Sequence, residues 1–278
     1  MTIADIILRA AIGLGIGFII GLTGVGGGVL VLPSLTFVLG LMPSVAVGTA
    51  NLYASITKIF ASYSHMRLGH VSGRAALLLL IGAVPGGLAT GLWINYTVRN
   101  NQGSIVQMHR FQDRLGTLLT VVVILAAAYM LFNTIYHFRK KETVDPDCTR
   151  SSRALSDSPL RVVLAIISGV FVGAMIGATS IGGGVIVVPL LLGLFCLDAR
   201  ETVGTSIVIA VVLTIITTVV YGAGGQIDLP TGLIMGAAAV PGTRFGAKCV
   251  KRLPEKVIRC ILAAVILVAA CLMIAGQR

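Results

Sequence analysis

Long apolar stretches separated by short polar segments make up most of the chain. In the first half they span residues 3–22, 29–41, 46–66, 75–96 and 115–138, and in the second half 160–177, 185–197, 202–222, 230–248 and 257–275. A helix of about 20 apolar residues crosses a bilayer. The pattern therefore predicts an all-α polytopic membrane protein with about ten transmembrane segments, five in each half.

The second segment of each half is short. Residues 29–41 and 185–197 would form helices of about 20 Å at 1.5 Å per residue, whereas the hydrocarbon core is about 30 Å thick. Each either turns back as a re-entrant segment, which gives eight spans, or crosses because the glycine-rich loop before it is sunk into the membrane, which gives ten.

The chain repeats itself at a constant displacement of 156 positions, the distance from Thr23 to Thr179. The residues that recur in this way include Thr23, Gly26, Gly27, Gly28 and Pro33, which return as Thr179, Gly182, Gly183, Gly184 and Pro189, and the triplet 47–49, which returns as 203–205. A repeat of this length indicates a duplicated unit. We expect a first transmembrane repeat over residues 1–138, a linker over 139–159 and a second repeat over 160–278.

The basic residues favour ten spans. With ten spans 14 Lys and Arg residues fall on one side and 5 on the other, whereas eight spans divide them 9 to 10. Because Lys and Arg gather on the cytoplasmic side, we expect a cytoplasmic linker and both termini outside the cell (inner/plasma) membrane. An odd number of spans per half makes the two repeats inverted, as in many secondary transporters.

Composition agrees with a membrane protein. Apolar residues make up 56% of the chain and charged residues 11%, so the net charge of +11 is interpreted as topology and not as binding to nucleic acid. The five cysteines have no CxxC spacing, which predicts neither a disulfide framework nor a metal site. No cofactor is expected. The amino terminus lacks a basic start and a cleavage site, which favours a first membrane helix over a cleaved signal.

The two glycine runs, residues 23–28 and 179–184, are the leading candidates for chemistry. Consecutive glycines allow a backbone to approach a ligand closely, and free amides at a buried helix start bind anions. Pro33 and Pro189 suit the first turn of a helix. Tight helix packing is the alternative use of such glycines.

Ionisable residues inside the apolar segments point to an anion. Lys58 and Arg244 lie deep in their segments, and Lys58 shares a helical stripe with Ser55, Asn51 and Gly48. Such buried cations are functional candidates, with snorkelling to the interface as the alternative. All ten acidic residues fall in loops, tails or first turns, which makes an anion the expected cargo. The candidate substrate-binding residues are Thr23, Gly26, Gly27, Gly28, Thr49, Asn51, Lys58, Thr179, Ser180, Gly182, Gly183, Gly184, Thr205 and Arg244.

The paired runs Thr-Gly-Val-Gly-Gly-Gly-Val-Leu-Val-Leu-Pro and Thr-Ser-Ile-Gly-Gly-Gly-Val-Ile-Val-Val-Pro, each followed by Val-Gly-Thr, resemble those of the TauE/SafE sulfite exporter family. The resemblance implies a transporter, not an enzyme, for a small sulfur-containing anion such as sulfite, thiosulfate or an organosulfonate such as sulfoacetate, working by alternating access in the lipid bilayer. A passive anion channel and a membrane-embedded thiol-relay enzyme are the alternatives.

Overall fold

A computed structural model describes residues 2–23, 28–67, 69, 71–100, 107, 110–122, 124–125, 159–181, 184, 186–195, 197 and 199–250. Its labelled elements are α1 (Ile3–Thr23), α2 (Gly28–Pro33), the π-helical η1 (Ser34–Val38), α3 (Pro43–Arg67), α4 (Gly73–Asn100), α7 (Pro159–Thr179), α8 (Val187–Phe195), α9 (Ala199–Ala223) and α10 (Leu229–Val250). Residues 110–122 are also helical. The described part of the chain contains no strand, which confirms the all-α prediction. The predicted linker and most of the fifth and tenth segments lie outside the described residues.

Four described helices are long and apolar enough to cross a membrane, at Ile3–Gly21, Gly73–Asn100, Val162–Thr179 and Glu201–Ala223. Their outer surfaces carry large apolar side chains such as Trp93, Phe171 and Val219, each more than half exposed. Such surfaces are unfavourable in water and suit contact with lipid. Helices α3 and α10, of 25 and 22 residues, are comparably long but less apolar.

The helix boundaries repeat at the displacement found in the sequence. Both ends of α7 lie 156 positions after those of α1, and both ends of α9 lie 156 positions after those of α3. The turns that follow α3 and α9 contain Gly69 and Gly225, with φ values of +68° and +69°, a backbone conformation that glycine adopts without strain. The duplication thus extends from residue types to backbone conformation.

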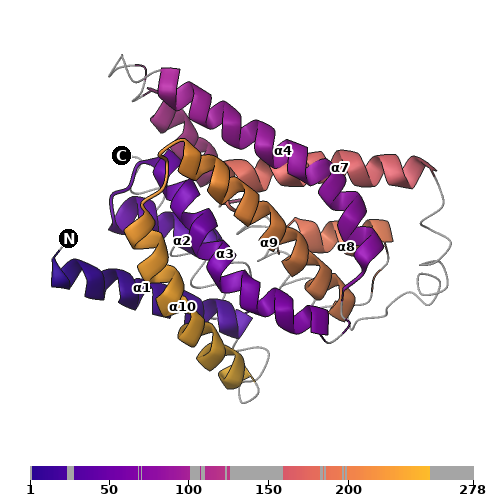
Figure 1. Cartoon of the computed structure of the whole chain (residues 1–278), viewed down its shortest axis with the longest axis horizontal. Helices are drawn as coiled ribbons and strands as arrows, with labels where there is room; N and C mark the ends of the chain where they lie inside the picture. Colours follow the sequence, from indigo (N-terminus) through magenta and orange to yellow (C-terminus); the bar gives the residue numbers. More distant parts are fainter. Residues whose placement is uncertain are drawn as a thin grey trace.

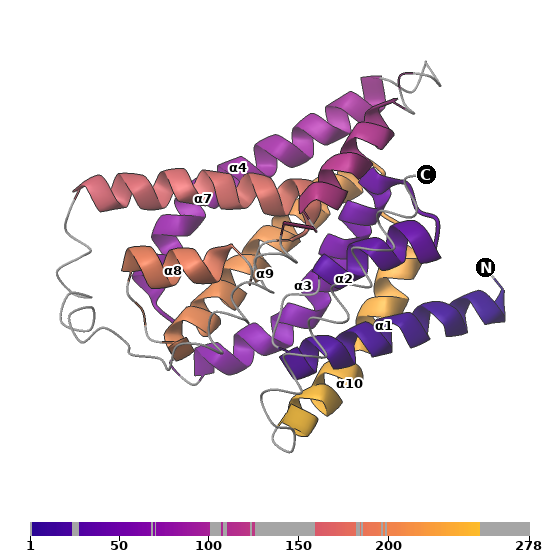
Figure 2. The same ribbon diagram turned by 180° about the vertical axis from the view of Figure 1, so that it is seen from behind.

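Each half packs against the other through equivalent helix pairs. Helix α1 packs on α10, and α7 packs on α4, while α3 and α9 contact each other between these pairs (Figures 1 and 2). A Cβ on Gly13 would lie 2.6 Å from the Cα of Met235, and one on Gly169 would meet the carbonyl oxygen of Leu79. These two contacts are related by the same displacement. Glycines let the paired backbones approach, as in membrane helix packing.

The order of these contacts gives the relative direction of the helices. From Gly13 to Gly21 along α1, the partners on α10 advance from Met235 to Thr243, so α1 and α10 run parallel. Helices α4 and α7 run parallel by the equivalent contacts.

Helix α3 also runs parallel to α10, because Gly232 meets Leu52 and Gly236 meets Ile56. In contrast, Gly48 near the start of α3 meets Tyr221 near the end of α9. Helix α4 runs parallel to α9, because Gly87 lies near Thr217 and Gly91 near Val220. Helices α1, α3 and α10 therefore run one way and α4, α7 and α9 the other.

Both second segments are short helices, as expected. Helices α2 and η1 have 6 and 5 residues, about 16 Å together at 1.5 Å per residue, and α8 has 9 residues. Pro189 lies in the first turn of α8, but the same prediction for Pro33 is wrong, because α2 begins at Gly28 and Pro33 is its last residue. Pro33 has no N–H to donate, and the next turn widens into η1, where the Leu39 N–H bonds the Ser34 carbonyl at 3.1 Å.

Candidate functional site

The two glycine runs meet in the folded protein. Gly28, the first residue of α2, lies against the turn that follows α7: a Cβ there would come 2.8 Å from the carbonyl carbon of Ser180 and 3.2 Å from the Cα of Ile181. Thr23 ends α1, and Gly184 lies in the turn before α8. The other glycines of the prediction, at positions 26, 27, 182 and 183, lie outside the described residues.

Ser180 has an unusual backbone and an unpaired hydroxyl. Its φ is +57°, which costs a non-glycine residue energy, and the equivalent position in the first half is Gly24. The side chain is 2% exposed, and its Oγ has no hydrogen-bond partner among the described residues. Strain of this kind gathers at functional sites.

Neighbouring bonds hold Ser180 in this conformation. Its N–H donates to the Ile176 carbonyl at 2.8 Å, which ends α7. The Thr179 hydroxyl donates to the Met175 carbonyl at 2.6 Å and accepts from the Ile181 N–H at 3.1 Å. The Thr179 hydroxyl therefore bonds the nearby backbone, whereas the Ser180 hydroxyl forms no hydrogen bond with the described residues.

The predicted stripe on α3 faces the interior. Asn51 is 0% and Ser55 is 6% exposed, and Gly48 packs against Gln226 and Tyr221. Within the described part of the chain, the Asn51 amide has a hydrogen-bond partner for neither Nδ2 nor Oδ1. The Ser55 hydroxyl, by contrast, donates to the carbonyl of Leu52 in its own helix at 2.7 Å.

Lys58 continues this stripe one turn beyond Ser55 and is partly buried. Among the described residues it forms no ion pair or hydrogen bond. It shares the face of α3 that carries Asn51, because positions seven residues apart lie two turns apart on one side of a helix.

Tyr221 links the stripe on α3 to the end of α7. Its hydroxyl donates to the carbonyl of Gly177 at 2.8 Å, three residues before Ser180, and its Cβ lies 3.0 Å from a Cβ placed on Gly48. Ile181, which follows Ser180, and Ala50, which precedes Asn51, belong to one buried apolar cluster. The glycine-run contact and the α3 stripe are thus neighbouring parts of one interior.

Thr49 and Thr205 hold loops of the opposite half. The Thr49 hydroxyl accepts the N–H of Asp228 before α10 at 3.0 Å, and the Thr205 hydroxyl accepts the N–H of Ser72 before α4 at 2.9 Å. The two bonds are equivalent by the displacement of 156 positions, and both threonines are 0% exposed. These bonds, which we name the two loop latches, join the halves at the starts of α10 and α4.

Other hydroxyls of the second half are used within α9, and the remaining candidate, Arg244, lies elsewhere. In α9, Ser206, Thr214, Thr217 and Thr218 donate to carbonyls of the preceding turn, the structural use expected of hydroxyls in membrane helices. Arg244 is on the exposed side of α10, away from the interior that holds Asn51.

A polar network at the start of α3 was not predicted. The Ser44 hydroxyl donates to Gln226 Oε1 at 2.6 Å and accepts from Gln112 Nε2 at 2.9 Å. All three residues are buried. In the sequence, each lies near a segment boundary and resembles an ordinary loop residue, and no spacing pattern relates the three.

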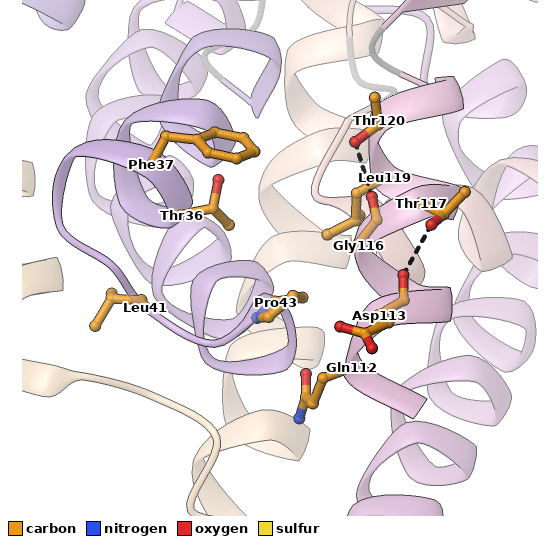
Figure 3. Close-up of a pocket in the computed structure, with 10 residues that line it drawn as sticks. All are labelled: Thr36, Phe37, Leu41, Pro43, Gln112, Asp113, Gly116, Thr117, Leu119 and Thr120. Carbon is orange, nitrogen blue, oxygen red and sulfur yellow. Dashed lines mark hydrogen bonds between the residues drawn. The ribbon is translucent and has the colours of Figure 1, made fainter. Parts of the chain in front are cut away.

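A pocket of about 370 Å³ adjoins this network, between η1 and the helical residues 110–122. Figure 3 shows Thr36 and Phe37 on one side, with Asp113, Thr117 and Thr120 on the other. The hydroxyls of Thr117 and Thr120 donate to carbonyls of their own helix. None of the predicted substrate-binding residues lines this pocket, and its carboxylate opposes an anion.

Among the described residues, the candidate site thus contains one unpaired buried amide, one unpaired buried hydroxyl and one cation. Of the acidic residues that the structure describes, Asp5 and Glu201 lie in first helical turns, Asp113 lies within the helical residues 110–122, and Asp228 lies in the loop before α10. No group of three metal-ligating side chains occurs among the described residues. This arrangement suits binding of a small anion by hydrogen bonds and charge.

The chain is similar to known membrane transporters over nearly its whole length. Residues 9–273 match the family model described as sulfite exporter TauE/SafE. The probable membrane transporter protein YjnA of Bacillus subtilis is 31% identical over 260 residues, covering 92% of this chain and 95% of that protein. The probable membrane transporter protein MJ0441 of Methanocaldococcus jannaschii is 25% identical over 274 residues, covering 90% of each. No solved structure matches the chain.

Proposed function

Because this chain belongs to the sulfite exporter TauE/SafE family of membrane transporters, we propose that it carries a small sulfur-containing anion across the cell (inner/plasma) membrane by alternating access. The candidate cargo is sulfite, thiosulfate or an organosulfonate such as sulfoacetate. The observation that carries this proposal is the contact of Gly28 with Ser180, which brings both glycine runs to one place. A carrier needs such a site between two halves that can move against each other.

The transmembrane architecture that we propose has ten segments in two inverted repeats. Helices α1 and α3 run parallel, so if both cross the membrane, the segment between them must return across it. This supports a crossing by α2 and η1 rather than a re-entrant turn. The opposite directions of α1 and α7, and of α3 and α9, support the inversion.

Lys58 supplies the positive charge of the proposed site. An anion entering the interior loses its hydration, and a nearby cation offsets part of that cost. Asn51 and Ser180 then provide hydrogen bonds from opposite halves, together with backbone amides of the glycine runs at Gly26, Gly27, Gly182 and Gly183. Arg244, on the exposed side of α10, is assigned to an access path or to the membrane interface.

Alternating access requires that one end opens while the other stays closed. The two loop latches at Thr49 and Thr205 join the halves at equivalent positions, and both are formed in this structure. We assign this state as occluded. Breaking one latch would free the start of α10 or of α4, which gives two equivalent openings.

Flux in proteoliposomes tests the proposal. The unaltered protein should transport at least one of the anions sulfite, thiosulfate and sulfoacetate. It should not transport chloride. Lys58→Ala should bind that anion about 10-fold or more weakly, since hydrogen bonds to charged groups contribute about 1.5–3 kcal/mol, while Lys58→Arg retains more. No flux of any sulfur anion, or Lys58 variants that transport like the parent, would contradict the assignment.

A further inference from the structure

The side-chain amide of Asn51 is buried but forms no hydrogen bond with the described residues. It is 0% exposed, and neither its Nδ2 nor its Oδ1 has a hydrogen-bond partner among the residues that the structure describes. Buried amides in folded proteins are almost always paired, so an orphaned one needs an explanation. Tyr53, whose hydroxyl is also buried and unpaired, projects from nearly the opposite side of α3, because two residues turn a helix by about 200°.

The surroundings of Asn51 favour a bound ligand as the partner of its unpaired amide. It lies on the face of α3 that carries Lys58, seven residues further on, which places a cation along the same stripe. Among the described residues, the second half contributes one unpaired buried hydroxyl, that of Ser180. Asn51, Ser180 and Lys58 can therefore form more hydrogen bonds than they form with the described residues, and these are free for a ligand.

The amide distinguishes between classes of anion. Its Nδ2 donates hydrogen bonds, but its Oδ1 only accepts them. A fully deprotonated oxyanion has acceptors alone, so its approach would pair Nδ2 and leave Oδ1 buried and unpaired. A ligand with its own O–H would pair both atoms. In addition, a single cation at Lys58 balances one negative charge, not two.

We propose that Asn51 selects a monoanion that carries a hydrogen-bond donor, such as hydrogensulfite or a hydroxylated sulfonate, over sulfite dianion and thiosulfate. This inference rests on the proposed function and narrows its substrate class. A site built to pair a ligand hydroxyl rejects the analogue that lacks it, because the site's own polar group is then left unpaired.

The test compares two monoanions that differ only in a hydroxyl group. Binding of 2-hydroxyethanesulfonate and ethanesulfonate to the purified full chain is measured by calorimetry. We expect the hydroxylated compound to bind about 10-fold more tightly, and Asn51→Leu to reduce this ratio to about one. Ser55→Ala is the matched control, because Ser55 lies on the same stripe but bonds its own helix, and it should keep the ratio.

A second experiment distinguishes hydrogensulfite from a hydroxylated sulfonate as the ligand that supplies the hydrogen-bond donor. Binding at constant total sulfite is followed across the pH range in which hydrogensulfite gives way to sulfite dianion. Affinity that falls with rising pH supports hydrogensulfite as cargo, and a sulfonate ratio of about 10 supports the hydroxylated class. Equal binding of both sulfonates, together with sulfite binding that rises with pH, overturns the inference and leaves the anion site intact. Binding of no sulfur anion at all contradicts the proposed function and this inference together.

Discussion

Gly28 and Ser180, from opposite halves of a duplicated chain, are in direct contact. A Cβ on Gly28 would meet the carbonyl group of Ser180, 2.8 Å from its carbon. The contact joins the start of one short helix to the turn that ends α7. At this contact the two repeats of the sequence lie side by side.

Gly28→Ala should therefore destabilise the protein. The added methyl group meets backbone and not a flexible side chain, and overpacking of this kind typically costs about 1–3 kcal/mol. Thermal unfolding of the purified protein in detergent measures the effect. Gly15→Ala is the control, because a Cβ on Gly15 has nothing within 4 Å. An equal melting temperature for the two variants would place the two glycine runs apart.

Ser180→Gly tests two effects separately: the backbone strain at Ser180, and the contribution of its hydroxyl to anion binding. Relief of the left-handed conformation gains about 1–2 kcal/mol, which the greater freedom of glycine in the unfolded chain offsets by about 0.5–1 kcal/mol. We expect a melting temperature equal to or above that of the parent, with anion affinity about 10-fold lower because the hydroxyl is lost.

Ser180→Ala is the companion variant, since it removes the hydroxyl and keeps the strain. It should lose the same affinity without any gain in melting temperature. Unchanged affinity in both variants would show that the Ser180 hydroxyl does not contact the ligand.

The loop latches give a prediction about stability. Thr49→Val leaves the Asp228 N–H without its partner, and Thr205→Val does the same to Ser72. An unpaired buried donor costs about 1–3 kcal/mol, so both variants should melt at a lower temperature. Thr214→Val should change little, because its hydroxyl bonds only its own helix. If the first two variants keep their stability but lose affinity, the hydroxyls serve the substrate instead.

Much of the helix pattern could be predicted from sequence, because the length of each apolar segment and the constant displacement between the repeats can be read along the chain. The expected segment 46–66 is α3, and the expected 202–222 is α9, with boundaries shifted by a few residues. The polar stripe of α3 was also foreseeable, since spacings of three and four place residues on one face of a helix. The predicted domain boundaries remain a prediction.

Other features depend on contacts between distant segments. The sequence gives no sign that α1 packs on α10 and not on its neighbour α3, because the glycines that allow it match any close partner. Thr49 and Ser180 resemble each other as small polar residues, yet one is paired with a loop and the other is unpaired. Only the folded chain separates these roles.

The loops before α4 and α10 test the direction of the segments. In the ten-span inverted arrangement they face opposite sides of the membrane, whereas with eight spans they face the same side. Gly73→Cys and Leu229→Cys occupy equivalent exposed positions at the starts of these helices. In a protein with its five native cysteines replaced by serine, an impermeant maleimide should label position 229 from outside intact cells and position 73 only after permeabilisation.

Labelling of both positions from outside would favour eight spans. With the native cysteines present, Cys148 in the linker should likewise resist the reagent in intact cells. Its labelling from outside would contradict the cytoplasmic linker.

Counterflow in proteoliposomes tests the central claim most directly, because a carrier exchanges its cargo through one moving site. Vesicles are loaded with unlabelled sulfur anion, diluted into radiolabelled sulfur anion, and followed over time. The alternating-access account predicts that the label accumulates transiently above its equilibrium level, and that preloading with chloride abolishes this overshoot. A monotonic approach to equilibrium with either preload, whatever its rate, would contradict a carrier and identify a channel.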